Sequence, residues 1–210
     1  MGNPVFAALY DRMVAANERA GFDDRRAELL AGARGATLEL GAGTGLNLRH
    51  YPAAVTELVL AEPDRHMARR LRDRVAAAGR AAEVVDAPAE HLPFEDGRFD
   101  TAVVTLVLCT VDDPAQALNE IARVLKPGGR LLFLEHVRTP AGPRLARWQD
   151  RLERPWGWVA GGCHPNRDTV AAVEASPLRV ESAAPGVMPK APPLVRPLVA
   201  GAAVRDADDA

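Results

Sequence analysis

Short apolar runs alternate with amphipathic stretches along the first two thirds of this chain. The apolar runs are rich in Leu, Val and Ala and predict buried strands at residues 37–40, 58–61, 83–85, 101–108 and 130–135. Between them, helical spacing begins at Asp64 and ends at Gly79, and begins again at Asp113–Pro114 with apolar positions every three or four residues. Strand and helix in alternation predict an α/β fold with a doubly wound parallel sheet.

The two ends of the chain have a different pattern. Residues 4–20 have helical spacing with Phe6, Leu9 and Met13 on one face, and a short helix over 24–31 follows. After residue 136 comes a segment rich in Arg, Pro and Gly that holds all 3 tryptophans and includes a predicted helix over 143–153. These aromatics either complete the core or form a lid over a site. Residues 178–181 and 198–204 predict the last strands, with a proline-rich stretch between them.

Composition narrows the class of protein. A length of 210 residues suits one domain, and 48% apolar with 26% charged residues is typical of a folded globular chain. The net charge of -2 argues against a nucleic-acid partner. With 2 cysteines, neither a disulfide framework nor a cysteine-rich metal site is expected, and we predict a cytoplasmic setting with no metal. The N-terminus lacks the layout of a secretion signal, and no membrane anchor is expected.

A glycine-rich turn follows the first predicted strand, in the sequence T-L-E-L-G-A-G-T-G over residues 37–45. Glycine permits positive φ and lets a ligand lie against the main chain. No lysine follows Gly45, so the phosphate-binding loop of nucleotide hydrolases is absent, and Leu46 stands where a dinucleotide site requires glycine. The carboxylate of Glu39 beside the turn would repel a phosphate and attract a cationic ligand. The pattern therefore favours S-adenosylmethionine, which carries a sulfonium and an α-amino group.

Acidic residues also end the next two predicted strands. Glu62 is placed to accept the ribose hydroxyls, and Asp86, followed by Ala87, to accept the adenine amine. Ligands of open parallel sheets bind at the carboxyl ends of the strands, so both acids are expected to meet the glycine turn in one crevice.

Five segments in this order resemble class I S-adenosylmethionine-dependent methyltransferases: E39-L-G-A-G-T-G45, Glu62, D86-A87, F99 to V111, and L125 to H136. The resemblance implies a Rossmann-like, mostly parallel seven-stranded sheet in a single domain, and S-adenosylmethionine as methyl donor with S-adenosylhomocysteine as product. It also implies a set of cofactor-binding residues, namely Glu39, Gly41, Ala42, Gly43, Gly45, Glu62, Pro63, Asp86, Ala87, Thr105 and Leu106.

Residues 106–111, Glu135–His136, 147–150, 162–163 and Arg167 further resemble the methyltransferase-like 7 (thiol S-methyltransferase) family and its bacterial relatives. The resemblance implies a small-molecule acceptor, with a thiol favoured. Ubiquinone and menaquinone C-methyltransferases are similar through the cofactor half, so C- or O-methylation of a quinone-like or phenolic metabolite is the alternative. A protein that binds the cofactor without catalysis is a third hypothesis.

Three residues are catalytic candidates on the acceptor side. His136 could take the acceptor's proton, with Glu135 orienting it; alternatively, Glu135 only binds neighbouring backbone amides. Cys109 is either a functional thiol or a small buried apolar residue.

We expect five segments along the chain. These are N-terminal helices that cover the site (1–34), the cofactor-binding core (35–138), an aromatic substrate lid (139–168), a C-terminal helix with strands (169–205) and a flexible tail (206–210).

Overall fold

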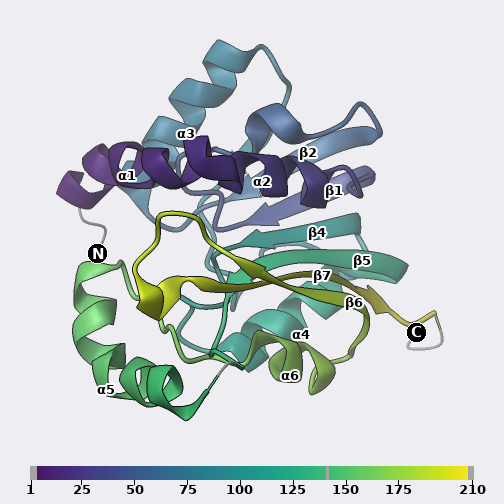
Figure 1. Cartoon of the computed structure of the whole chain (residues 1–210). Coiled ribbons are helices and arrows are strands. Elements are labelled where there is room, and N and C mark those ends of the chain that lie inside the picture. The colour runs from purple at the N-terminus through teal and green to yellow at the C-terminus, as the bar shows by residue number, and fades with distance from the viewer. Residues whose placement is uncertain (1–3, 141, 208–210) are drawn as a thin grey trace.

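Seven strands form one sheet in the order β3-β2-β1-β4-β5-β7-β6 in the computed structural model, which describes residues 4–140 and 142–207 (Figure 1). The strands from β3 to β5 pair in parallel, and β7 runs antiparallel between β5 and β6. The predicted fold class, a mostly parallel seven-stranded sheet flanked by helices, is confirmed. The strands are β1 Gly35–Leu40, β2 Val55–Ala61, β3 Glu83–Val85, β4 Phe99–Thr105, β5 Leu125–His136, β6 Leu178–Val187 and β7 Pro197–Arg205.

Helices cover both faces of this sheet because successive strand residues point to opposite sides. Leu60 and Val103 pack with Leu30 and Leu71 from the helices on one face. On the other face, Leu38 and its neighbours pack with the next helices in the chain. The helices of the first face are α1 Pro4–Asn17, α2 Asp23–Leu30 and α3 Arg65–Ala78, with a π-helical turn, η1, at Glu18–Phe22; those of the second are α4 Pro114–Val124 and α6 Thr169–Glu174.

Helix α5, Pro143–Val159, lies at the edge of the molecule where the parallel strands end, on the left in Figure 1. Helix α1 reaches the same edge from the other side of the sheet. Short 3-10 turns occur at Leu48–His50 (η2) and Pro193–Val195 (η3).

The predicted helix boundaries have clear physical causes. The Asp64 side chain accepts hydrogen bonds from the amides of His66 and Met67, and α3 ends at Gly79 with a φ of 63°. The Asp113 side chain accepts from the amides of Ala115 and Gln116, and a proline occupies the first turn of α4. Helix α3 therefore begins and ends, and α4 begins, where the sequence predicts.

Other boundaries differ from the prediction. Strand β4 ends at Thr105, three residues before the predicted end, and β5 begins at Leu125. Helix α5 continues to Val159, and β6 continues to Val187. The prolines fit these strands because Pro185 lies on the edge strand β6 and Pro197 is the first residue of β7.

In the part of the chain that the structure describes, no helix has both the length and the apolar character needed to cross a membrane. Of the predicted tail over 206–210, residues 208–210 lie outside the described residues.

Candidate active site

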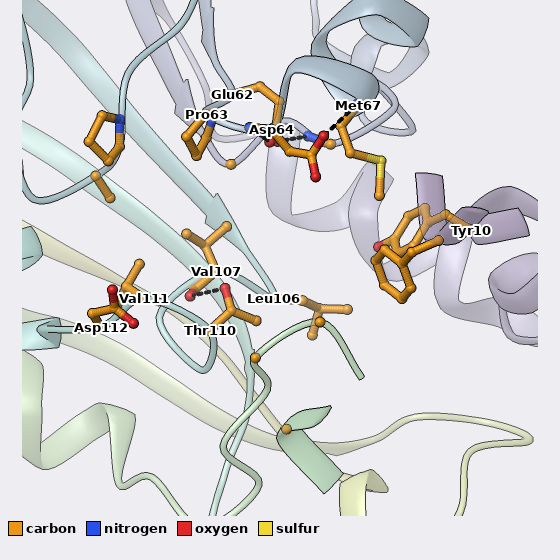
Figure 2. Close-up of a pocket in the computed structure, with 18 of the residues that line it drawn as sticks. Tyr10, Glu62, Pro63, Asp64, Met67, Leu106, Val107, Thr110, Val111 and Asp112 are labelled. Carbon is orange, nitrogen blue, oxygen red and sulfur yellow. Dashed lines mark hydrogen bonds between the residues drawn. The ribbon is translucent and has the colours of Figure 1, made fainter. Parts of the chain in front are cut away.

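A crevice of about 710 Å³ lies at the carboxyl ends of the parallel strands, where the strand order reverses between β1 and β4. Figure 2 shows Glu62, Pro63 and Asp64 on one side of it, with Leu106 and Val107 on the other. Helix α1 contributes Phe6 and Tyr10, and residues 157–162 complete the wall. The volume is in the range of small-molecule and cofactor sites.

The three glycines of the turn have different roles. All have positive φ: 57° at Gly41, 58° at Gly43 and 84° at Gly45. A Cβ at Gly41 would lie 2.7 Å from a methyl group of Val107, and one at Gly45 would lie 2.7 Å from a methyl group of Leu71. At Gly43 the nearest atom would be 4.0 Å away. Open space therefore lies beside Gly43. At Gly41 and Gly45 the absence of a side chain also allows Val107 and Leu71 to pack against the turn.

Glu62 fixes the glycine turn against the end of β2. Its Oε2 accepts a hydrogen bond of 2.7 Å from the Gly43 amide, and its Oε1 accepts one of 2.8 Å from the Asp64 amide. The side chain lines the crevice, and burial raises its pKa above the ordinary value. Each carboxylate oxygen can accept a second hydrogen bond, so Glu62 retains acceptor capacity for a ligand.

Glu39 lies beneath the turn and outside the residues that line the main crevice. Its carboxylate accepts hydrogen bonds from Asn47 Nδ2 at 2.9 Å and from the Tyr51 hydroxyl at 2.7 Å, and Arg26 donates to Asn47 Oδ1 at 2.9 Å. Burial raises the pKa of Glu39 to about 7. Glu39 borders a small cavity of about 30 Å³ with Ala42, Gly43 and Thr105 among its walls. The sequence did not predict that Asn47 and Tyr51 hydrogen-bond Glu39.

The predicted adenine-binding residues lie near the rim. Asp86 is exposed and Ala87 is buried, and neither borders the crevice, whereas Pro88, Ala89 and Glu90 do. A role for Asp86 with the adenine amine therefore stays a prediction.

Leu106 stands where the crevice meets a second cavity of about 360 Å³. Its φ of 60° is unusual for a residue with a branched side chain and costs about 1 to 2 kcal/mol. The conformation is held by a hydrogen bond of 2.9 Å from the Leu106 amide to the Leu134 carbonyl. The two cavities share five lining residues, namely Phe6, Tyr10, Leu106, Thr110 and Gly161.

Glu135 holds the loop that follows Leu106. Its oxygens accept hydrogen bonds from the amides of Val107, Leu108 and Cys109 at 2.8, 3.1 and 3.2 Å. The side chain is fully buried, and burial raises its pKa to about 7. It borders neither cavity. This geometry agrees with the alternative in which Glu135 binds backbone amides, and it explains why β4 stops at Thr105.

The second cavity is largely apolar and contains the other two catalytic candidates, His136 and Cys109. His136 is buried, which lowers its pKa to about 4 against the opposing effect of the Val195 backbone. Its Nδ1 is buried and has no hydrogen-bond partner among the described residues. A neutral imidazole carries a proton on one ring nitrogen and a lone pair on the other, so the neutral ring keeps one lone pair at pH 7.

Further hydrogen bonds connect helix α1 and the segment after α5 to the loops of the site. Asp11 of α1 accepts hydrogen bonds from Thr44 Oγ1 at 2.6 Å and from Arg74 at 2.5 Å, so α1 is anchored to the glycine turn and to α3. Arg167 donates to the Leu108 carbonyl at 2.5 Å. Asp11 had no signal in the sequence, because its partners are more than 30 residues away.

Known proteins share this architecture. Residues 38–133 match the profile of a methyltransferase domain. The chain is 40% identical over 145 residues to thiol S-methyltransferase TMT1B of Homo sapiens, across 67% of this chain and 59% of that protein. It is 29% identical over 203 residues to the human TMT1A, across 95% and 83% of the two chains. The chain thus covers less than two thirds of TMT1B.

A C-methyltransferase of ubiquinone and menaquinone biosynthesis, UbiE of Ectopseudomonas mendocina, is 40% identical over 129 residues, across 59% of this chain and 50% of that protein. A solved structure from Thermotoga maritima, described as a possible histamine N-methyltransferase, aligns with a TM-score of 0.72 over 97% of each chain. Its sequence identity is 20%, so this likeness concerns the fold.

The different roles of the glycines generate a stability prediction. Gly43→Ala is expected to cost about 1 to 2 kcal/mol of unfolding free energy, since alanine would adopt positive φ. Gly45→Ala is expected to cost about 1 to 3 kcal/mol more, because its Cβ would overlap the fully buried Leu71. Urea denaturation of the two variants and the wild type measures this difference. Equal midpoints for the two variants would contradict the packing role of Gly45.

Proposed function

The chain carries a methyltransferase domain over residues 38–133 on the class I fold, and from this premise we propose that it methylates a small-molecule thiol with S-adenosylmethionine. The observation that carries the proposal is the junction at Leu106, where a crevice edged by Glu62 adjoins an apolar cavity. Two substrates bound in the two cavities would meet there.

The crevice residues fit the cofactor. The remaining lone pairs of Glu62 would accept the ribose hydroxyls, and Pro63 and Met67 would contact the adenosyl group. The space beside Gly43 would take the methionine portion, with Thr105, Leu106 and the buried Glu39 near it. When bound, S-adenosylmethionine supplies an electrophilic methyl carbon on a sulfonium. The chain's own contribution is alignment and exclusion of water, which can lower a barrier by roughly 7 to 11 kcal/mol.

The acceptor cavity favours an apolar thiol. Its walls include Phe22, Met188 and Val195. Its polar groups are the two cysteines and the His136 ring together with Tyr10, Asn17, Glu18, Arg26, Thr110 and Trp156. A thiol with an ordinary pKa near 8.5 needs little assistance to ionise, and a neutral imidazole lone pair can accept its proton. We assign this role to the His136 ring, which borders the cavity. Glu135 positions the loop at residues 107–109, and Cys109 forms part of the wall.

The covering segments act as a lid in this proposal. Helix α1 supplies Phe6 and Tyr10, and the segment over 139–168 supplies Trp158, Gly161 and Gly162. Trp158 is 85% exposed although it borders the crevice, as expected of a side chain that closes over a ligand.

The second candidate is methylation of carbon or oxygen in a quinone-like or phenolic metabolite, which the similarity to UbiE favours. A panel of aromatic thiols, phenols and quinol precursors with labelled S-adenosylmethionine separates the two. We expect turnover on apolar thiols. Turnover confined to phenols or quinols would replace our proposal by the second candidate, and cofactor binding without any product would indicate a non-catalytic binder.

Glu62→Ala is expected to weaken S-adenosylhomocysteine binding by about 1.5 to 3 kcal/mol, because charge-assisted hydrogen bonds to the ribose are lost. Isothermal titration calorimetry measures the affinity. The matched control is Glu57→Ala, which removes a carboxylate from β2, the strand that precedes Glu62, and should leave binding unchanged. Unaltered affinity in Glu62→Ala would refute the ribose role.

His136 generates a pH prediction. Its pKa of about 4 means that the ring is neutral at pH 6 to 8, so thiol methylation by the wild type should vary little over that range. In His136→Gln the rate should depend on free thiolate, rising about tenfold per pH unit up to the thiol's own pKa, and should be about 10²-fold lower at pH 7. Steady-state rates across pH test this, with the exposed His91→Gln as control. Parallel profiles for wild type and His136→Gln would exclude His136 as the base.

A further inference from the structure

The only two cysteines of the chain lie together in the wall of the acceptor cavity. Cys109 follows β4 in the loop held by Glu135, and Cys163 follows α5 in the lid segment. The His164 amide donates to the Cys109 carbonyl at 2.6 Å. Standard backbone dimensions then limit the Cα atoms of Cys109 and Cys163 to roughly 7 Å apart. A disulfide between them is therefore within geometric reach.

The two thiols have different electrostatic surroundings. The neighbouring Cys109 thiol and Arg167 lower the pKa of Cys163, and burial and Glu135 oppose them. The pKa of Cys109 is raised by the neighbouring Cys163, by burial and by Glu135. Cys163 is thus the more readily ionised thiol and the better nucleophile of the pair.

The pair does not have the ligand set of a metal site. The described residues contain no group of three His, Cys, Asp or Glu side chains placed to hold a metal ion. His164, the neighbour of Cys163, instead pairs with Glu153 at 2.7 Å. If the two cysteines served only to fill the core, they would not need to border a cavity of about 360 Å³ or to differ in pKa.

We propose that Cys109 and Cys163 form a thiol–disulfide exchange site that takes a small apolar disulfide from the acceptor cavity. The Cys163 thiolate attacks one sulfur of the disulfide RS–SR, forming a mixed disulfide and releasing one RS⁻. Cys109 then attacks the Cys163 sulfur, loses its proton, and releases the second RS⁻ as the protein disulfide forms. Two electrons pass from the protein dithiol to the small disulfide, and an external dithiol reductant restores the starting state.

The site shares its cavity with the proposed methyl acceptor, but the exchange requires no methyl donor. Cleavage of a disulfide in this cavity would produce free thiol at the place where we propose that a thiol is methylated. An oxidised acceptor would in this way be converted to a substrate without leaving the protein.

The test uses the reduced 210-residue chain with excess 2,2′-dithiodipyridine and no cofactor. The wild type should release two thiopyridone molecules per chain and become lighter by two hydrogens, as an intramolecular disulfide. Cys109→Ser should release one and retain a pyridyl mixed disulfide on Cys163. Cys163→Ser should react at least tenfold more slowly than Cys109→Ser, because the remaining thiol has the raised pKa.

A matched pair tests the influence of Cys109 on Cys163. Cys109→Ser keeps a donor to Cys163 and Cys109→Ala does not, so the alanine variant should react several-fold more slowly at pH 7. Circular dichroism verifies that each variant is folded.

The proposal is overturned by two mixed disulfides on the wild type, by dimers linked between chains, or by a folded wild type that reacts only in denaturant. Equal rates for the Cys163→Ser and Cys109→Ser variants would overturn it too. Because the assay contains no S-adenosylmethionine, exchange without methylation would count only against the methyl-transfer proposal, and methylation without exchange only against this one.

Discussion

The site depends on buried carboxylates that hydrogen-bond the loops at the ends of the central strands. Glu62 joins the glycine turn to the end of β2, and Glu135 binds three successive amides after β4. Beneath the turn, Glu39 is held by Asn47 and Tyr51. A carboxylate out of water is costly unless its lone pairs are satisfied, so movement of any of these loops would leave a buried group unpaired. The crevice is therefore fixed before a ligand binds.

This arrangement permits the strained backbone at Leu106. Its left-handed conformation would relax if the following loop were free, but Glu135 holds the next three amides and Arg167 holds the Leu108 carbonyl. The result is a narrow junction between two cavities of different character, one edged by acids and one largely apolar. Rigid placement of two reactants is the principal contribution that a protein makes to a displacement whose reactive carbon belongs to a cofactor.

Local sequence patterns predicted the helices and strands. The features that these patterns missed depend on contacts between residues far apart in the sequence. Asp64 and Gly79 mark the ends of α3 because capping depends on neighbouring residues. The sequence also indicated acids at strand ends, but not that Glu39 lies beneath the turn with Asn47 and Tyr51, because these contacts form only after folding. Likewise, the glycine pattern suggested that each glycine of the turn contacts a ligand. In the structure, a side chain at Gly45 would clash with Leu71, which is distant in sequence.

The low polarity of the second cavity affects which ligands it can bind and which group can take a proton from them. A charged base buried beside this cavity would carry a large desolvation cost, and His136 avoids it by remaining neutral. A ring with a pKa of about 4 is a weak base, and a thiol, with a reference pKa near 8.5, requires less of it than a carbon acid or an alcohol does. The neighbouring Cys163 and burial raise the pKa of Cys109, whereas Cys109 and Arg167 favour a thiolate at Cys163. A weakly basic ring and a pair of thiols in one cavity suit sulfur chemistry, and for this reason we propose a thiol in preference to a phenol or quinol as the acceptor.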